Sequence, residues 1–482
     1  MDRVGTPTPP LDPDHTLRDA WIAEAAAFVH AELDGLQDAP TLGPQGAELE
    51  RLLQQLPRGI PENAISMSEA LDRIGLAAKL GMQPATPGYL AYIPGGGIFA
   101  SALAGFISMA LNRYVGLAAA SPGMVRFEQD VVKLFATELG MPGGSGGILT
   151  SGGSMANLSA IVAARVAAFG EGADFTRATL YLSAEAHRSV AKAARIVGIP
   201  AANLRTVPVD SALRMDAFSL ANMVAQDRIE GYRPFLVAAT AGTTNTGAVD
   251  SLEEIADLCE REDIWLHVDG AYGGMFVLTT EGKKLLQGIG RADSVTLDPH
   301  KGLFLPYGCG ALVVRRAAML VQAHAEDASY LQDLAHRTEE PSPSQLGPEL
   351  TRNDRGILVW LPLALHGLGS FRAALDEKLE LARYFWDALT DLPVEIPVEP
   401  ELSIVAFRLP RMPGETLAGW NQRNRAWLER INDRRRVHLS STMLPAPEGE
   451  VFTLRVCILS FRTARPQIEL ALKELAECLA HG

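Results

Sequence analysis

The fold is decided by two stretches of sequence, Ile264-Trp-Leu-His-Val-Asp-Gly-Ala-Tyr-Gly-Gly274 and Ser294-Val-Thr-Leu-Asp-Pro-His-Lys-Gly302. Each begins with a short apolar run that is typical of a buried β-strand, and each ends in ionisable residues. We expect strands at Gly147–Thr150, Thr179–Leu182, Phe235–Thr240, Ile264–Val268, Ser294–Leu297 and Ala311–Val314, and helices at Ser154–Phe169, Arg188–Val197 and Ser251–Glu262. This alternation predicts an α/β domain built around a largely parallel sheet.

The whole chain, at 482 residues, is too long for one compact core, so several domains are expected. Residues 1–85 are predicted to form a polar tail and a helical extension, and residues 86–375 the large α/β domain. Residues 376–482 are predicted to form a small α/β domain. Its expected elements are strands at Ser403–Arg408 and Thr453–Ile458 and a closing helix at Pro466–Leu479.

The composition excludes several classes of protein. A formal net charge of -14 argues against nucleic acid or an anionic membrane as the main partner, because both need clustered Lys and Arg. The four cysteines show no C-x-x-C spacing, so neither a disulfide framework nor a zinc site is indicated, and no metal is expected. The N-terminus has no apolar run behind a basic start, which leaves a cytoplasmic protein as the expectation.

The candidate chemistry lies where the predicted strands end, because ligands of parallel sheets bind outside the carboxyl ends of the strands. Lys301 follows one strand, with Asp298 and His300 beside it and an apolar segment after it. A lysine in such a setting can form an imine with an aldehyde. Asp269 follows another strand and would suit a protonated pyridine nitrogen. A structural aspartate that caps the next turn is the alternative.

Two further features complete this constellation. The segment Thr150-Ser-Gly-Gly-Ser-Met-Ala-Asn157 joins a strand to a helix, and its small residues and free N–H groups would bind a phosphate. A plain glycine turn with Ser154 as a helix cap is the alternative reading. His187 ends another strand and would stack on a pyridine ring. An anion site, a pyridinium partner and an imine lysine together point to pyridoxal 5'-phosphate (PLP).

These motifs resemble the group II PLP-dependent decarboxylases, which include aromatic-L-amino-acid and glutamate decarboxylases. The resemblance runs from about Pro87 to Arg462 and rests on Ala120-Ser-Pro-Gly-Met-Val-Arg-Phe-Glu128, Thr150–Ser154, Ala186-His187, Ala241-Gly-Thr-Thr244, His267-Val-Asp269 with Ala271-Tyr272, and Asp298-Pro-His-Lys301. It implies PLP fold type I and a homodimer with active sites at the subunit interface. It also implies site residues: Lys301 as the imine lysine, Asp269 as the ring-nitrogen partner, His187 as the stacking imidazole, Gly153 and Ser154 at the phosphate, Thr244, Ala271, Asp298 and His300 around the cofactor, and Tyr92 and Arg355 at the substrate.

The sequence departs from the family in the polar segment Gln332–Asp354. The family's loop carries a tyrosine that is credited with returning a proton to the substrate carbon, and this chain has none between Leu331 and Gly356. Tyr330, His336 or His187 could replace it. The expected reaction is decarboxylation of an L-amino acid to the amine. The alternatives are oxidative deamination to an aldehyde and another carbon–carbon lyase reaction.

The sequence favours one class of substrate and gives little support to two other classes of protein, a hydrolase and a PLP-binding regulator. No basic pair near Tyr92 marks a dicarboxylic substrate, and Gly95–Gly97 could leave room for a ring, which favours an aromatic amino acid. The pattern Gly143-x-Ser145-x-Gly147 fits a hydrolase nucleophile elbow, but its strand follows the serine rather than preceding it. A PLP-binding regulator would need a basic helix-turn-helix region, which the N-terminal segment lacks.

Overall fold

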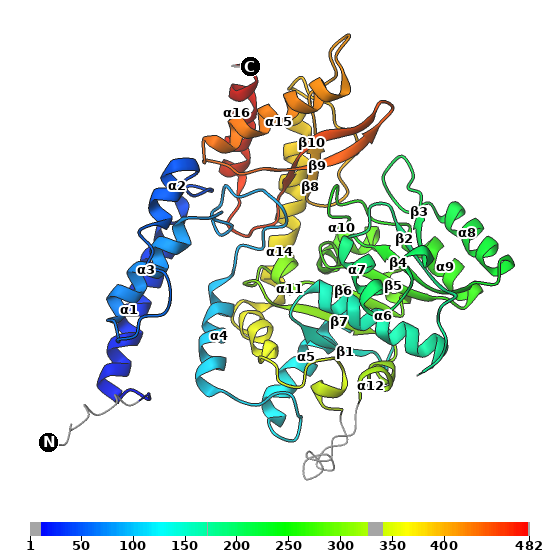
Figure 1. The fold of residues 1–482 in the computed structure, drawn as a ribbon, viewed down its shortest axis with the longest axis horizontal. Helices are drawn as coiled ribbons and strands as arrows, with labels where there is room; N and C mark the ends of the chain where they lie inside the picture. The colour runs from blue at the N-terminus through cyan, green and yellow to red at the C-terminus, as the bar shows by residue number, and fades with distance from the viewer. Residues whose placement is uncertain (1–10, 171, 326–340, 481–482) are drawn as a thin grey trace.

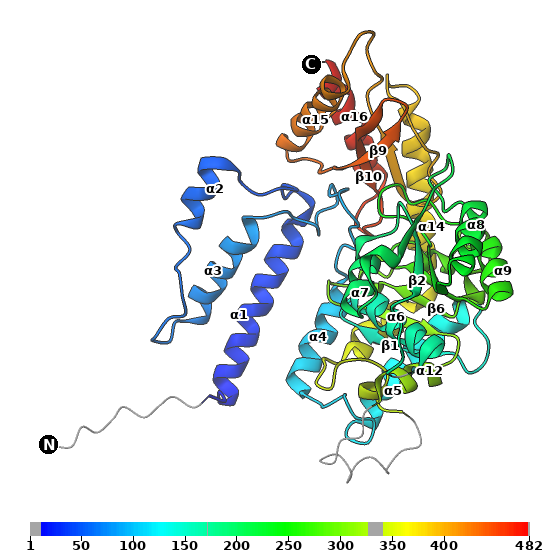
Figure 2. The same cartoon turned by 45° about the vertical axis from the view of Figure 1, so that its right-hand side comes forward.

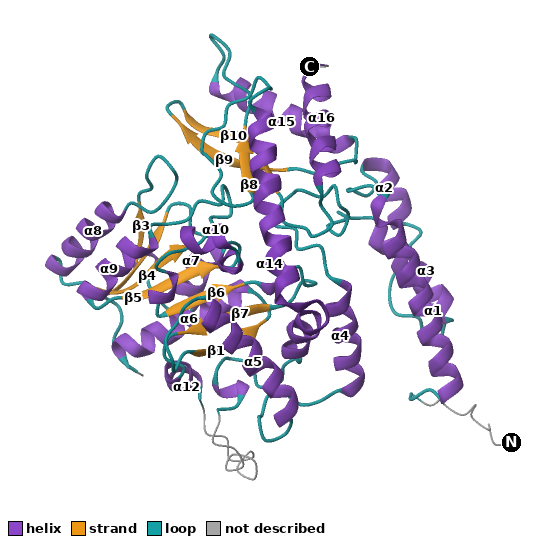
Figure 3. Ribbon diagram, turned by 180° about the vertical axis from the view of Figure 1, so that it is seen from behind, coloured by secondary structure: helices purple, strands orange, loops and turns teal. Residues whose placement is uncertain are grey.

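The computed structural model describes residues 11–170, 172–325 and 341–480. Figure 1 shows a central α/β body, a smaller C-terminal part above it, and N-terminal helices that stand to one side. The long helix α14 (Arg355–Leu389) passes from the central body into the C-terminal part, as the reverse view in Figure 3 shows.

The central body is built on a seven-stranded sheet in the order β1-β7-β6-β5-β4-β2-β3. The strands are β1 (Gly146–Thr150), β2 (Ala178–Ser183), β3 (Leu204–Val207), β4 (Arg233–Thr240), β5 (Trp265–Gly270), β6 (Ser294–Leu297) and β7 (Gly310–Val314). All neighbours pair in parallel except β7, which is antiparallel to both β1 and β6. The predicted, mostly parallel sheet of a fold-type I domain is confirmed. All six predicted strands overlap observed ones, and β3 is the strand that periodicity missed.

Helices cover both faces of this sheet, and two hydrophobic clusters fill the space between. The cluster on one face holds α5, α8, α9 and part of α14, and the cluster on the other face holds α6, α7 and α12. The helices of the central body are α4 (Phe99–Leu111), α5 (Pro122–Glu138), α6 (Gly153–Phe169), α7 (Arg188–Ile196), α8 (Ala217–Ile229), α9 (Leu252–Glu262), α10 (Thr280–Leu285), α11 (Pro299–Gly302) and α12 (Ala318–His324).

The C-terminal part has its own three-stranded antiparallel sheet, in the order β8-β10-β9. Its elements are β8 (Ile404–Phe407), α15 (Leu417–Asp433), β9 (Ser440–Ala446), β10 (Gly449–Cys457) and α16 (Arg465–Ala480). A third hydrophobic cluster joins these elements to the second half of α14. α14 itself is interrupted at Gly367, whose φ of 72° and ψ of 148° are not helical.

The N-terminal extension is helical, as predicted, with α1 (His15–Asp34), α2 (Gly46–Leu53) and α3 (Met67–Lys79). Figure 2 shows that these helices are set apart from the central body. No residue of α1 is buried, although Trp21, Ile22 and Val29 are apolar.

One described helix, α14, is long and apolar enough to cross a membrane by length and composition alone. The core helix of a soluble protein passes the same test, and α14 buries Phe371, Leu375 and Phe385 in the two hydrophobic clusters that it joins.

Candidate active site

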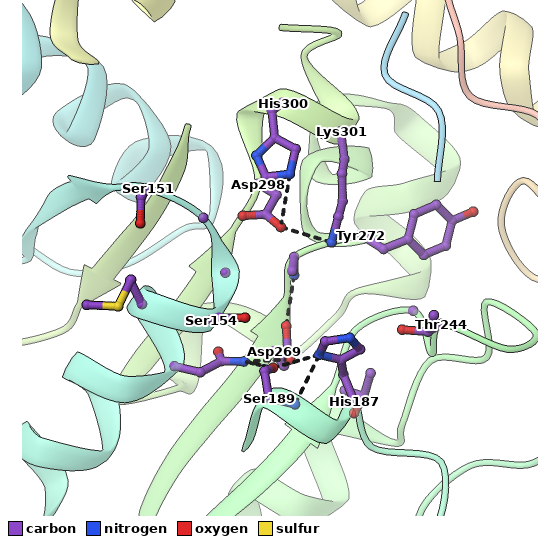
Figure 4. A pocket seen from close by; sticks show the side chains of 17 residues that line it. Ser151, Ser154, His187, Ser189, Thr244, Asp269, Tyr272, Asp298, His300 and Lys301 are labelled. Atoms are coloured by element: carbon purple, nitrogen blue, oxygen red, sulfur yellow. Dashed lines mark hydrogen bonds and ion pairs between the residues drawn. The ribbon is translucent and has the colours of Figure 1, made fainter. Parts of the chain in front are cut away.

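A cavity of about 300 Å³ lies at the carboxyl edge of the sheet, where β1, β4, β5 and β6 end. It gathers nine residues that the sequence singled out: Gly153, Ser154, His187, Thr244, Asp269, Ala271, Asp298, His300 and Lys301. Figure 4 shows Lys301 and Asp298 on one side of this space, and Asp269 and His187 on the other.

Lys301 is held at the cavity by the carboxylate of Asp298, the residue that precedes the short helix α11. Its Nζ lies 2.9 Å from Oδ2 of Asp298, and the Asp298 side chain is only 3% exposed. The other oxygen, Oδ1, is buried without a hydrogen-bond partner among the described residues. His300 donates from Nδ1 to the carbonyl oxygen of Cys309 at 2.6 Å, which turns its Nε2 toward Asp298 at 3.8 Å. The lysine is therefore only partly exposed and ion-paired, as the apolar segment after it suggested.

Asp269 lies at the C-terminal end of β5 and is buried. Its Oδ2 accepts a hydrogen bond from Nδ2 of Asn157 at 2.9 Å, and its Oδ1 accepts one from the backbone N–H of Ala271 at 3.1 Å. Both partners are donors, so they fix the orientation of the Asp269 side chain. Such a carboxylate can hold a proton on a heterocyclic nitrogen opposite it.

The N-terminus of α6 provides the anion site. Its cap residue, Gly152, makes no side-chain capping hydrogen bond, so the first-turn N–H groups and the positive end of the helix dipole face the cavity. A Cβ atom on Gly153 would lie 3.1 Å from both Asp298 Oδ2 and the Cβ of Ala271. That contact is tight, so glycine keeps the cradle open.

These features together fit PLP. The helix start suits a phosphate, the Asp269 carboxylate suits a pyridinium, and the Lys301 amine suits an aldehyde. Across the described residues, no group of His, Cys, Asp and Glu side chains is arranged to hold a metal ion.

His187 caps α7, and its ring is fixed by the first turn of that helix. Its Nδ1 lies 2.7 Å from Oγ of Ser189 and accepts the Ser189 backbone N–H at 3.3 Å. The imidazole therefore lies beside the Asp269 carboxylate with its other edge free to face the cavity (Figure 4).

Two predicted substrate residues are not among those that line the cavity. Arg355 is buried at the start of α14, where it pairs with Glu349 at 2.6 Å. Tyr92 is half-exposed with a φ of 53°, in a segment that the C-terminal part contacts. Their roles stay predictions. Tyr330 and His336, the candidate proton donors, lie outside the described residues.

The surroundings of Tyr92 correct one expectation. A Cβ on Gly95 would lie 2.1 Å from the carbonyl oxygen of His300, so this glycine is required by close backbone packing, whereas a Cβ on Gly97 would meet nothing within 4 Å, so the predicted room for a ring is limited to Gly97. The fold also brings two arginines to a segment that has no basic pair in sequence. Arg455 donates to the Tyr92 carbonyl at 3.0 Å, and Arg462 donates to the Gly96 carbonyl.

Sequence reasoning missed Asn157, Ser189 and His267, although all three stand within or beside the quoted motifs. Asn157 is completely buried on the sheet-facing side of α6. A polar residue inside an otherwise apolar stripe was the available signal, since buried amides occur where partners satisfy them. The hydrolase alternative gains nothing from the structure, because β1 begins directly after Ser145.

Comparison with known proteins agrees with this geometry. Residues 50–410 match the model of the pyridoxal-dependent decarboxylase conserved domain. An aromatic-L-amino-acid decarboxylase of Bacillus atrophaeus is 35% identical over 436 residues, which cover 88% of this chain and 89% of that protein. Two solved structures share the fold: Oryza sativa TDC with PLP and tryptamine (TM-score 0.90, 24% identity, covering 98% of this chain and 99% of that one) and Catharanthus roseus tryptophan decarboxylase in complex with L-tryptophan (TM-score 0.88, 24% identity, covering 98% of this chain and 100% of that one).

Proposed function

The chain belongs to the family of pyridoxal-dependent decarboxylases, and for this PLP-dependent amino acid carboxy-lyase we propose an aromatic L-amino acid as the substrate. The observation that carries the assignment of the site is one cavity that gathers Lys301, Asp269 and His187 around the open start of α6. The aromatic substrate is supported by the relatives, since the Bacillus and Cavia porcellus proteins at 35% and 30% identity are both aromatic-L-amino-acid decarboxylases.

The cofactor is held by residues from several strand ends. In our proposal the α6 start with Gly153 and Ser154 binds the phosphate, Lys301 binds the aldehyde covalently, and Thr244, Ala271, Asp298 and His300 line the remainder. When bound, PLP supplies an aldehyde that captures amines and a cationic ring that withdraws electrons from the bond to be broken.

Three side chains then carry the chemistry in this proposal. Asp269, whose two oxygens are held by the Asn157 amide and the Ala271 N–H, would be the partner of the ring nitrogen. Lys301 gives up its place to the substrate amine, and the nearby Asp298 carboxylate keeps its Nζ within the cavity. His187, whose Nδ1 is held by Ser189 and which lines the cavity, would orient the substrate beside the cofactor, whose ring would supply the electron withdrawal for loss of CO2.

The assay is a panel of L-amino acids offered to the holoenzyme, with CO2 measured and products identified by mass. We expect tryptophan, tyrosine or phenylalanine to exceed glutamate at least about tenfold in kcat/KM, the discrimination of roughly 1.4 kcal/mol in transition-state binding. Preferential turnover of glutamate would contradict the aromatic assignment and would direct attention to Arg455 beside Tyr92.

A second outcome is favoured by the absence of tyrosine between Leu331 and Gly356. Without that proton donor, O2 can take the electrons, so that one amino acid, O2 and water give the aldehyde, CO2, ammonia and hydrogen peroxide. The same panel separates the two outcomes. Amine and CO2 in equal amounts without peroxide identify a simple decarboxylase, and stoichiometric peroxide and ammonia identify the aldehyde reaction.

We also propose a homodimer with its active sites at the subunit interface. It is supported by an exposed apolar face on α4, beside α14. The residues of this face are Phe99, Leu103, Phe106, Met109 and Leu111, with Leu365 from α14. An exposed patch of this kind is typical of a subunit contact. In sedimentation analysis, Phe106→Asp should shift the dimer toward monomer, whereas Phe218→Asp, on exposed apolar surface of α8, should not.

We also propose how the chain divides into domains and where in the cell the protein acts. The bounds 1–85, 86–375 and 376–482 are supported by the separate hydrophobic cluster of the C-terminal part, which α14 joins to the central body. A cytoplasmic location is supported by the four cysteines, all free and buried. A net charge of -14 supports a small-molecule substrate rather than nucleic acid or a membrane as the partner.

A further inference from the structure

The buried amide of Asn157 lies between the Asp269 carboxylate and Ser189, which contacts the His187 ring. The Nδ2 atom of Asn157 donates to Oδ2 of Asp269 at 2.9 Å and to Oγ of Ser189 at 3.0 Å. Its Oδ1 accepts from Nε2 of His267 at 3.0 Å and from Oγ1 of Thr296 at 2.6 Å. Asn157 is 0% exposed, so all four of its hydrogen-bonding positions are satisfied inside the protein.

The local sequence explains why these groups meet. Side chains of a strand alternate between its two faces, so Trp265, His267 and Asp269 share one face of β5. His267 lies opposite Ser294 on β6, and Asp269 opposite Thr296, which places all five polar or aromatic groups under α6.

Several hydrogen bonds of this network have a direction that is fixed because one partner can only donate or only accept. The carboxylate of Asp269 accepts, so the amide nitrogen of Asn157 must face it and the amide oxygen must face His267. At the other end, the indole nitrogen of Trp265 can only donate, and it donates to Oγ of Ser294 at 2.8 Å. Because Oδ1 of Asn157 accepts, Nε2 of His267 donates to it at 3.0 Å, and in a neutral His267 the Nδ1 atom then accepts from Oγ of Ser294 at 2.8 Å.

The Asn157 end therefore places a proton on Nε2 of His267. Burial supports the neutral form, since it lowers the pKa of His267 to about 4 against the opposing effect of Asp269. No described donor or acceptor of Asn157 or His267 is left unpaired, which is the condition under which a buried polar network specifies one arrangement.

Through Ser189 the same network reaches the imidazole of His187. Nδ1 of His187 accepts the Ser189 backbone N–H, so the Ser189 hydroxyl, whose oxygen accepts the second hydrogen of the Asn157 amide, turns its own hydrogen to the same nitrogen at 2.7 Å. The backbone N–H of Ser189 points to the same nitrogen at 3.3 Å. With two donors facing Nδ1, the proton of the neutral imidazole resides on Nε2, at the edge that faces the cavity.

From this geometry we infer that Asn157 and Ser189 are positioning residues, which hold His187 in the Nε2–H tautomer and tie its orientation to the Asp269 carboxylate through one shared amide. The inference rests on the proposed function for the role of His187 in the reaction. The tautomer itself is a property of the resting protein, so it can be measured without any substrate.

The test uses holoenzyme labelled with 15N-histidine, in which the His187 signals are identified by their loss in His187→Gln. In the wild type, Nδ1 should show the signature of a bare nitrogen and Nε2 that of a protonated one. Ser189→Ala removes one of the two donors, so the two tautomers should mix. It should also lower kcat roughly tenfold, the order expected for one lost hydrogen bond at a reacting group, with little change in KM or in the PLP absorbance.

Three variants complete the design. Ser189→Thr keeps the hydroxyl and should restore both the tautomer and kcat. Ser159→Ala is the matched control, because it removes a buried hydroxyl of α6 that has no hydrogen-bond partner among the described residues. Asn157→Leu removes the amide, so it should also weaken PLP binding, because Asp269 loses a donor.

The outcomes separate cleanly. A protonated Nδ1 in the wild type overturns the inference, and so does a Ser189→Ala protein whose tautomer and kcat both match the wild type. If the substrate panel fails while the tautomer responds as described, the proposed function is wrong, but the positioning of His187 by Asn157 and Ser189 stands.

Discussion

The pH dependence of stability should carry a contribution from His267, which the variant His267→Gln removes. Glutamine can keep a donor toward Asn157 but has no titratable group. In the folded protein, burial lowers the pKa of His267 from 6.5 to about 4, while the unfolded chain keeps the ordinary value. Between these values only the unfolded chain takes up the proton, so acid favours unfolding. A pKa difference of about 2.5, at roughly 1.4 kcal/mol for each pH unit, corresponds to about 3 kcal/mol.

The contribution is thus present above pH 6.5 and lost as the pH falls through about 4. The assay is urea unfolding of wild type and His267→Gln between pH 4 and pH 8 at constant ionic strength. Packing differences between the two side chains do not depend on pH, so they cancel in the slope. The stability of the wild type relative to the variant should fall by about 3 kcal/mol toward acid. A difference that is flat, or that grows toward acid, would refute a neutral buried His267.

Two further changes test the site, and a third tests a buried ion pair outside the cavity lining. Gly153→Val should weaken PLP binding by at least about tenfold while the apoprotein unfolds at nearly the wild-type midpoint, because the new Cβ lies 3.1 Å from Asp298 Oδ2; titration of the apoprotein with PLP measures this. Asp269→Asn should lower kcat roughly 100-fold with the cofactor still attached, in steady-state kinetics beside absorbance. Arg352→Met should cost about 3–5 kcal/mol in urea unfolding, because it leaves the buried Glu128 carboxylate, now 2.9 Å from Arg352 Nη1, without its cation.

The central sheet could be predicted because its strands are short, apolar and bounded by turns. The exceptions have physical reasons. β3 is only four residues long and lies at the sheet edge, and three of its four residues, Leu204–Thr206, are not buried, so it lacks the apolar run. In the C-terminal sheet, β9 buries only Ser440 and Leu444 and contains Pro445, so it has no continuous apolar run that would indicate a strand.

The grouping of residues around the cavity could be predicted because they stand near strand ends or a helix start, where local sequence determines position. The supporting residues could not, since their function depends on contacts between distant segments. Asn157 meets His267 across 110 residues, and Arg455 meets the Tyr92 carbonyl across 363. No residue near Tyr92 in the sequence predicts its contact with Arg455.

The most direct test is to locate the covalent attachment of PLP. After reduction of the holoenzyme with borohydride, intact mass should rise by one cofactor for each chain, and the modified peptide should contain Lys301. Lys301→Ala should show no such adduct and no absorbance band at the visible edge, while Lys284→Ala, at an exposed lysine, should behave as the wild type. A reducible adduct that persists in Lys301→Ala, or that maps to another lysine, would contradict the assignment of this cavity.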